Sequence, residues 1–181
     1  PPAGPGLLPA SLPGWARVTP FVLERQKQFR PRGPWPLGSR MYGAGYDETR
    51  IIGEKLSAVR TADQSTAARF WYEPSLTGWN RIARVVAAPR ALDLWQQARL
   101  FALINLAMAD GFIAGWDAKF TYNSFRPVTA IRAGDTDRKD HTLGDPAWET
   151  FLNTPPHPDY VSTHSVLGGA AATVLARFFC T

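Results

Sequence analysis

The sequence has 181 residues, with 20 Lys or Arg against 15 Asp or Glu, so its net charge is +5. Hydrophobic residues at 45% and aromatic residues at 12% supply enough apolar material for a buried core and exclude wholesale disorder. A single cysteine excludes an intramolecular disulfide framework, and charged residues at only 19% are too few to coat nucleic acid. The composition therefore predicts a modestly basic globular protein without a nucleic-acid partner.

The first 45 residues are rich in proline and glycine. Nine of the 16 prolines lie in the first 36 residues, and each removes a backbone donor and restricts the residue before it. We therefore predict an extended arm over residues 1–45 and a helical domain over residues 46–181. Four aromatic residues indicate that the arm wraps a domain rather than forming a loose linker: Trp15, Phe21, Phe29 and Trp35.

Hydrophobic residues recur at helical spacing after the arm. Three short helices are predicted over residues 47–60, 61–71 and 77–88, beginning at Asp47, Thr61 and Thr77. A long apolar helix then follows over residues 91–119. A helix that is apolar on nearly every face is either a central core helix or a membrane span. Asp110 would be costly near the middle of a bilayer, so the pattern favours a core helix and no membrane span.

The last third of the chain begins with turn-rich sequence. Residues 132–158 contain several Gly and Pro breakers, with one short helix expected over 147–152. Small apolar residues dominate residues 165–179, which is typical of a helix packed closely against its neighbours. No alternating strand pattern is present, and the predicted class is an all-α helical bundle.

One polar cluster lies at the end of the long helix, in the string Lys119-Phe-Thr-Tyr-Asn-Ser-Phe-Arg126-Pro127. Lys119 and Arg126 are seven residues apart, which would place them on nearly the same face of a continuous helix. Pro127 biases Arg126 away from helical geometry. Two cations that converge at the end of an apolar helix need an anion, although the spacing also permits two solvated side chains at a helix terminus.

A second polar cluster precedes the small-residue helix, in the string Pro155-Pro-His157-Pro-Asp-Tyr-Val-Ser162-Thr163-His164-Ser165. Ser162, Thr163 and Ser165 are all competent helix caps, and the first turn of a helix presents N–H groups to an anion. The simpler interpretation is one capping serine and a surface histidine. Together, however, the two clusters contain the donors of a cradle for a tetrahedral oxyanion.

These two strings resemble the signatures of the superfamily that unites type 2 phosphatidic acid phosphatases with vanadium-dependent haloperoxidases. Lys119-x6-Arg126-Pro127 matches the first signature. Val161-Ser162-Thr163-His164 is similar to the second, usually Pro-Ser-Gly-His, and the 33 intervening residues are an ordinary gap. The fuller strings look more like the bacterial haloperoxidase branch than the membrane phosphatases. The resemblance implies an all-helical fold of the haloperoxidase type.

Transferred residue by residue, the resemblance implies a vanadate cofactor. Lys119 and Arg126 would bind its equatorial oxygens, and Lys119 would also polarise peroxide. Ser162 would donate its hydroxyl and Thr163 its backbone N–H. His164 would be the acid–base residue that takes a proton from hydrogen peroxide.

Two further positions bear on the halide. Trp116 matches a tryptophan near the halide in the fungal chloroperoxidases. His157 occupies a position that is Phe in those enzymes and His in the algal bromoperoxidases, which favours bromide over chloride. The chain departs from the family in two ways. Thr163 replaces the usual Gly, and the third signature, Ser-Arg-x3-Gly-x-His, is absent, so no residue here is expected to ligate the metal directly.

The resemblance thus implies that the protein oxidises halide with hydrogen peroxide and halogenates small organic substrates. One alternative is a soluble acid phosphatase of the same superfamily. Another is a non-catalytic helical fragment, because the chain ends 17 residues after His164. We expect the missing segment to be deleted, cleaved off or supplied by a second chain. Family members are often exported and oligomeric, so we expect a periplasmic or extracellular protein that forms a homo-oligomer.

Overall fold

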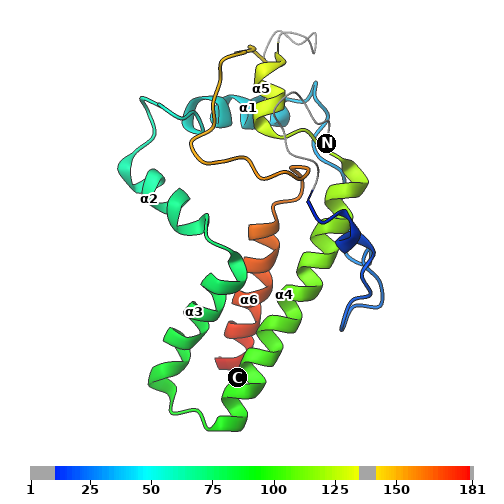
Figure 1. Cartoon of the computed structure of the whole chain (residues 1–181), viewed down its shortest axis with the longest axis vertical. Helices are drawn as coiled ribbons and strands as arrows, with labels where there is room; N and C mark the ends of the chain where they lie inside the picture. The colour runs from blue at the N-terminus through cyan, green and yellow to red at the C-terminus, as the bar shows by residue number, and fades with distance from the viewer. Residues whose placement is uncertain (1–10, 135–141, 180–181) are drawn as a thin grey trace. The chain divides into compact units, whose positions relative to one another are not determined.

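The computed structural model of the chain describes residues 11–134 and 142–179, so residues 1–10 of the predicted arm and Cys180 lie outside it. The elements in chain order are η1 (Pro13–Arg17), α1 (Arg40–Ile52), α2 (Ala62–Trp71), α3 (Ser75–Ala87), η2 (Ala88–Arg90), α4 (Leu94–Tyr122), α5 (Pro127–Arg132) and α6 (Thr163–Phe179) (Figure 1). Within this part of the chain, the only β-type pairing is one isolated bridge between Glu54 and Thr150. The predicted all-α class is confirmed.

The chain divides into two compact units. Unit 1 comprises Pro1–Leu12, Arg32–Arg69 and Thr121–Tyr160, and unit 2 comprises Pro13–Pro31, Phe70–Phe120 and Val161–Thr181. Residues of the predicted arm fall into both units. The boundary after residue 45 stays a prediction.

Unit 2 is built on α3, α4 and α6, which lie side by side in Figure 1, with α6 antiparallel to α4. Its buried core consists of Ala83, Leu100, Ile104, Met108, Leu167 and Ala171. The three core residues of α4 are spaced by four and so share one face of the helix. Glycines permit the close approach, because a Cβ at Gly168 would lie 3.3 Å from the Trp79 ring and one at Gly111 would lie 3.3 Å from Val166. The predicted close packing of the last helix is confirmed.

Helix α4 begins and ends three residues later than predicted. Asp93 accepts a hydrogen bond from the Gln96 amide and the Gln96 side chain accepts one from the Asp93 amide, which is a reciprocal N-terminal cap. The predicted core helix is not buried at its start, where Leu94 is 78% and Trp95 82% exposed. The stretch Leu94–Arg132 meets a membrane-span criterion by length and hydropathy, as core helices also do, and the absence of a span stays a prediction.

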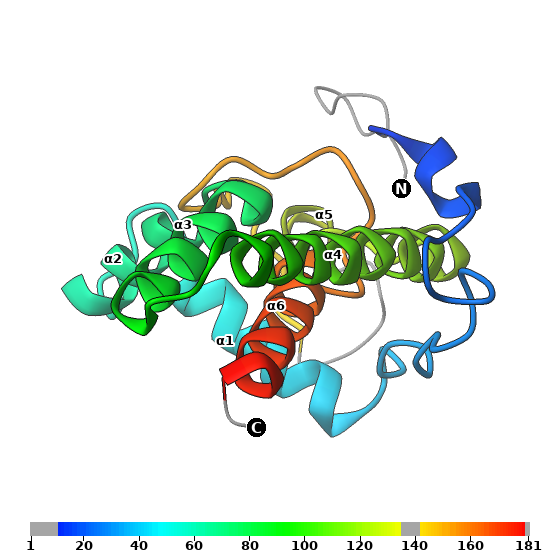
Figure 2. The ribbon, with the colours of Figure 1, turned by 90° about the horizontal axis from the view of Figure 1, so that it is seen from below.

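Residues 13–31 of the predicted arm bind to the C-terminal half of α4 (Figure 2). The buried carboxylate of Asp110 accepts hydrogen bonds from the backbone amides of residues 21, 22 and 23, at 2.6, 2.7 and 2.8 Å. Further along the same helix, Asp117 binds Arg30 through two bonds of 2.6 Å. The Trp15 ring also packs edge-on against Phe112. For this segment, the prediction that the arm wraps a domain is confirmed.

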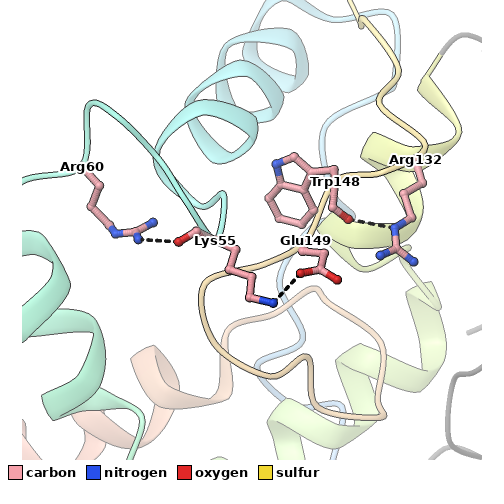
Figure 3. Close-up of polar contacts among 5 residues, drawn as sticks. All are labelled: Lys55, Arg60, Arg132, Trp148 and Glu149. Atoms are coloured by element: carbon pink, nitrogen blue, oxygen red, sulfur yellow. Dashed lines mark hydrogen bonds and ion pairs between the residues drawn. The ribbon is translucent and has the colours of Figure 1, made fainter.

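Unit 1 has its own small core, formed where α1 contacts α5, and its buried residues are Tyr46, Val128, Ile131 and Trp148. The irregular segment after residue 142 is tied to this core through polar contacts (Figure 3). Arg132 Nε donates to the Trp148 carbonyl at 2.8 Å, and Lys55 pairs with Glu149 at 2.6 Å. These contacts hold the chain that leads into the second polar cluster.

Three local predictions need correction. Helix α1 begins at Arg40 rather than at Asp47. No proline follows Pro36 in this part of the arm, so nothing prevents the helix from starting at Arg40, where the Ser39 hydroxyl accepts a hydrogen bond from the Tyr42 amide and caps it. Residues 147–152 form no helix, since their backbone pairs with the loop after α1, with Phe151 N donating to Gly53 O at 2.9 Å. The short helix α5 was not expected, although proline is favourable at the first position of a helix.

Candidate functional site

The first polar cluster begins in the last turn of α4. Lys119 lies there with only 1% of its surface exposed, so it is not a solvated cation. The helix ends at Tyr122, and Asn123 has a left-handed φ of 49°. Asparagine tolerates this conformation better than most residues and often ends helices with it. The chain therefore leaves the helical direction four residues after Lys119.

Arg126 is the N-cap residue of α5, with an extended backbone at φ −72° and ψ 150°. This is the geometry predicted from the proline that follows it. Its Nη1 pairs with the Asp159 carboxylate at 3.0 Å, and its buried Nε has no hydrogen-bond partner among the described residues. Burial lowers the pKa of Arg126, and the charge of Asp159 opposes that effect. The guanidinium is therefore a partly buried cation, and its buried Nε has unused donor capacity.

The second polar cluster forms the start of α6. The Ser162 carbonyl accepts the first helical hydrogen bond, from Val166 N at 3.1 Å, and its hydroxyl accepts from Ser165 N at 3.3 Å. Ser162 is therefore the cap. Thr163 is the first helical residue, and its buried hydroxyl has no partner in the part of the chain that the structure describes. The His164 ring is exposed, with Nε2 3.4 Å from the Glu73 carbonyl oxygen.

Within unit 2, the antiparallel packing of α4 and α6 puts two parts of the predicted site at the same end of the helix pair. Val166 of α6 packs against Gly111 of α4, so the first turn of α6 lies toward the C-terminal half of α4, which carries Lys119. The first turn of a helix carries free N–H groups and a partial positive charge. A buried ammonium and a helix N-terminus at one end of a helix pair favour the binding of an anion.

The two residues predicted near the halide belong to different units. Trp116 in unit 2 is 4% exposed, and its ring stacks on Phe112 with centroids 4.0 Å apart. His157 in unit 1 is half-buried, and its Nδ1 lies 3.0 Å from the Pro158 carbonyl oxygen. Because a carbonyl only accepts, Nδ1 must carry the hydrogen in this contact. Their joint role at a halide stays a prediction.

The donor set fits an oxyanion such as vanadate. It consists of N–H and O–H groups, and one of them, the buried Arg126 Nε, has no acceptor in the described parts of the chain. The Thr163 hydroxyl, which was not predicted as a donor, is also buried there without a partner. A buried donor without a partner costs free energy that a bound oxyanion would recover. Lys119, Ser162, Thr163 and His164 lie in unit 2 and Arg126 in unit 1. Their assembly into one cradle stays a prediction.

Sequence reasoning gave too little weight to three carboxylates. Asp159 pairs with Arg126, while Asp110 and Asp117 hold the arm on α4. The usable signal was the presence of two acidic residues seven apart in an apolar helix, since such residues need partners when buried. Their partners lie more than 80 residues away in sequence and could not be named from local pattern.

Fold and site together define an all-helical protein with the donors of an oxyanion-binding centre. A sequence model of the VCPO second helical-bundle domain matches residues 99–181. The chain is also 32% identical over 167 residues to the vanadium chloroperoxidase of Curvularia inaequalis. The chain also aligns, over 99% of its own length, with the crystal structure of the first bacterial vanadium-dependent iodoperoxidase. The TM-score of this alignment is 0.79 and the sequence identity is 29%. These comparisons support the vanadium haloperoxidase family for this chain.

The chain represents only part of the length of these relatives. The match takes in 82% of this chain but 23% of the chloroperoxidase, and the structural alignment spans 46% of the iodoperoxidase chain.

Proposed function

We propose that this chain is the part of a vanadate-dependent haloperoxidase that supplies most of the donors to the cofactor. The reaction is the oxidation of halide by hydrogen peroxide, with bromide favoured over chloride. The observation that carries the proposal is the buried Nε of Arg126, which has no partner among the described residues. Similarity to the vanadium haloperoxidases supports the identity of the anion that would bind there.

The chain's own residues divide the work between binding and proton transfer. Lys119 and Arg126 hold the anion by charge-assisted hydrogen bonds, which are about twice as strong as neutral ones. Ser162 and Thr163 add a hydroxyl and a backbone N–H from the first turn of α6. When bound, vanadate supplies the Lewis-acid centre at which peroxide is activated for attack by halide.

His164 is suited to accept the proton of hydrogen peroxide. Its ring is exposed, and its 3.4 Å contact with the Glu73 carbonyl oxygen is too long to be a strong hydrogen bond. A general base must be reachable by the proton it takes. The halide preference rests on His157, whose Nδ1 is held by the Pro158 carbonyl.

Vanadate binding tests the donor set directly. We expect the 181-residue chain to bind vanadate in a titration followed by ⁵¹V NMR. Arg126→Ala and Lys119→Met should each weaken binding at least about tenfold, the value of one charge-assisted hydrogen bond. Arg84→Ala removes an exposed arginine of α3 and is the matched control. Equal affinity in Arg126→Ala and Arg84→Ala would contradict the assigned role.

Activity is measured on the chain expressed with any flanking sequence that its gene encodes. Loaded with vanadate, it should brominate phenol red in the presence of bromide and peroxide, and His164→Ala should lower the rate constant by at least about 100-fold. Equal bromination without vanadate would refute the proposal. Hydrolysis of p-nitrophenyl phosphate without any halide oxidation would select the acid phosphatase instead.

A further inference from the structure

We propose that unit 1 binds a small hydroxylated aromatic molecule in a pocket between α1, the start of α5 and the segment around Tyr160. We infer further that this molecule is the organic acceptor of the oxidised halide. The second inference rests on the proposed function, whereas the pocket itself does not.

The pocket has the size and lining of a small-molecule site. Its volume is about 540 Å³, within the range in which proteins bind organic ligands. Most of its lining is apolar, and six aromatic residues contribute to it: Trp35, Tyr42, Tyr46, Tyr122, Phe125 and Tyr160. Aromatic rings bind other rings by offset or edge-to-face packing, so this lining favours a planar aromatic ligand.

Several of these rings are held in place by the protein. The Tyr46 hydroxyl donates to the Leu143 carbonyl at 2.7 Å, and the Tyr160 hydroxyl donates to the Arg32 carbonyl at 2.8 Å. The Tyr122 and Tyr160 rings meet at 62° with centroids 5.8 Å apart. Walls fixed in this way need little ordering when a ligand binds, which lowers the entropic cost of binding.

One polar group in the lining lacks a partner. The Ser124 hydroxyl is buried and makes no hydrogen bond to any described residue. Leaving a buried hydroxyl unsatisfied is unfavourable, and a ligand hydroxyl in the pocket would satisfy it. A phenol-type ligand matches the aromatic walls and this single polar contact.

The pocket adjoins the predicted vanadate-binding arginine. Asp159 lines the pocket and also pairs with Arg126, and its amide donates to the Ser124 carbonyl at 3.2 Å. A phenol held here would lie near Arg126, to which the proposed function assigns vanadate. Halogenation would then replace an aromatic C–H by a carbon–halogen bond, with the proton and the hydroxide of the hypohalous acid leaving as water. The ring hydroxyl activates the carbon that is attacked.

Calorimetric titration with 2-naphthol, without vanadate or halide, tests the pocket. We expect saturable binding tighter than about 1 mM. Gly45 lines the pocket, and a Cβ built there meets nothing within 4 Å, so Gly45→Phe should occupy the pocket and weaken binding at least about tenfold. Gly169→Phe adds the same side chain at an equally open helical glycine in unit 2 and should leave binding unchanged. Absence of binding, or equal loss in both variants, would overturn the proposal.

The Ser124 hydroxyl is tested separately. Ser124→Ala should weaken 2-naphthol binding about two- to tenfold and leave the binding of naphthalene unchanged, since naphthalene has no hydroxyl. Equal affinity of Ser124→Ala and the natural chain for 2-naphthol would overturn the assigned contact. If the protein binds 2-naphthol but does not oxidise bromide, the result would support the binding pocket and reject only the role of the pocket as the acceptor site.

Discussion

Replacing Asp110 by alanine should detach residues 21–23 of the arm from α4. The carboxylate is 4% exposed, and its two oxygens accept three backbone N–H groups, from Phe21, Val22 and Leu23. Alanine leaves all three donors without their acceptor. The Arg30–Asp117 pair then remains as the second polar attachment of the arm.

The magnitude follows from the number and surroundings of these bonds. A hydrogen bond to a charged group contributes about 1.5–3 kcal/mol, but Phe21 and Val22 are mostly exposed, so water replaces part of what the carboxylate provides. At about 1 kcal/mol for each bond, Asp110→Ala should lower the free energy of unfolding by about 3 kcal/mol. Asp110→Asn keeps one acceptor oxygen and should cost about half as much.

Urea denaturation measures the global effect, and amide hydrogen exchange locates it. The amides of residues 21–23 should exchange at least about tenfold faster in Asp110→Ala than in the natural chain, because they lose their acceptor. Asp63→Ala removes an exposed carboxylate of α2 and should change stability by no more than about 0.5 kcal/mol. Unchanged exchange at residues 21–23 would refute the assignment of Asp110 as the attachment point.

Two further predictions concern helix packing and pH. In thermal unfolding, Gly169→Ala should stabilise the protein by about 0.5–1 kcal/mol, because the added Cβ meets open space. Gly168→Ala should give no gain in stability, because its Cβ would lie 3.3 Å from the Trp79 ring. Equal gains in the two variants would disprove the close contact between Gly168 and Trp79. The hydrogen bond from Lys55 lowers the pKa of Glu149. The ion pair therefore stabilises the protein fully above the ordinary glutamate pKa of about 4.3, and this stabilisation is lost as pH falls through the lowered pKa of Glu149. An NMR titration should show this low midpoint and its return to the ordinary value in Lys55→Met; an identical midpoint in both proteins would contradict it.

Local sequence was sufficient for the helical class and for several details of the site. Thr61 caps α2 through a reciprocal pair with Gln64, as its type and position predicted. Arg126 is extended because Pro127 follows it, and α6 begins at a capping serine. These features depend on sterics and hydrogen bonds within a few residues, which the sequence displays directly. The spacing of the two motifs likewise indicated the donors of an anion site.

Tertiary structure decided whatever depends on distant partners. It showed that Lys119 is buried rather than solvated, that Asp159 pairs with Arg126, and that Asp110 holds a segment almost 90 residues earlier in the chain. It also prevented a helix at residues 147–152, where pairing with the loop after α1 satisfies the same backbone groups. Length, composition and charge could not reveal these outcomes, because burial and pairing arise from which segments meet in space rather than from the residues beside them.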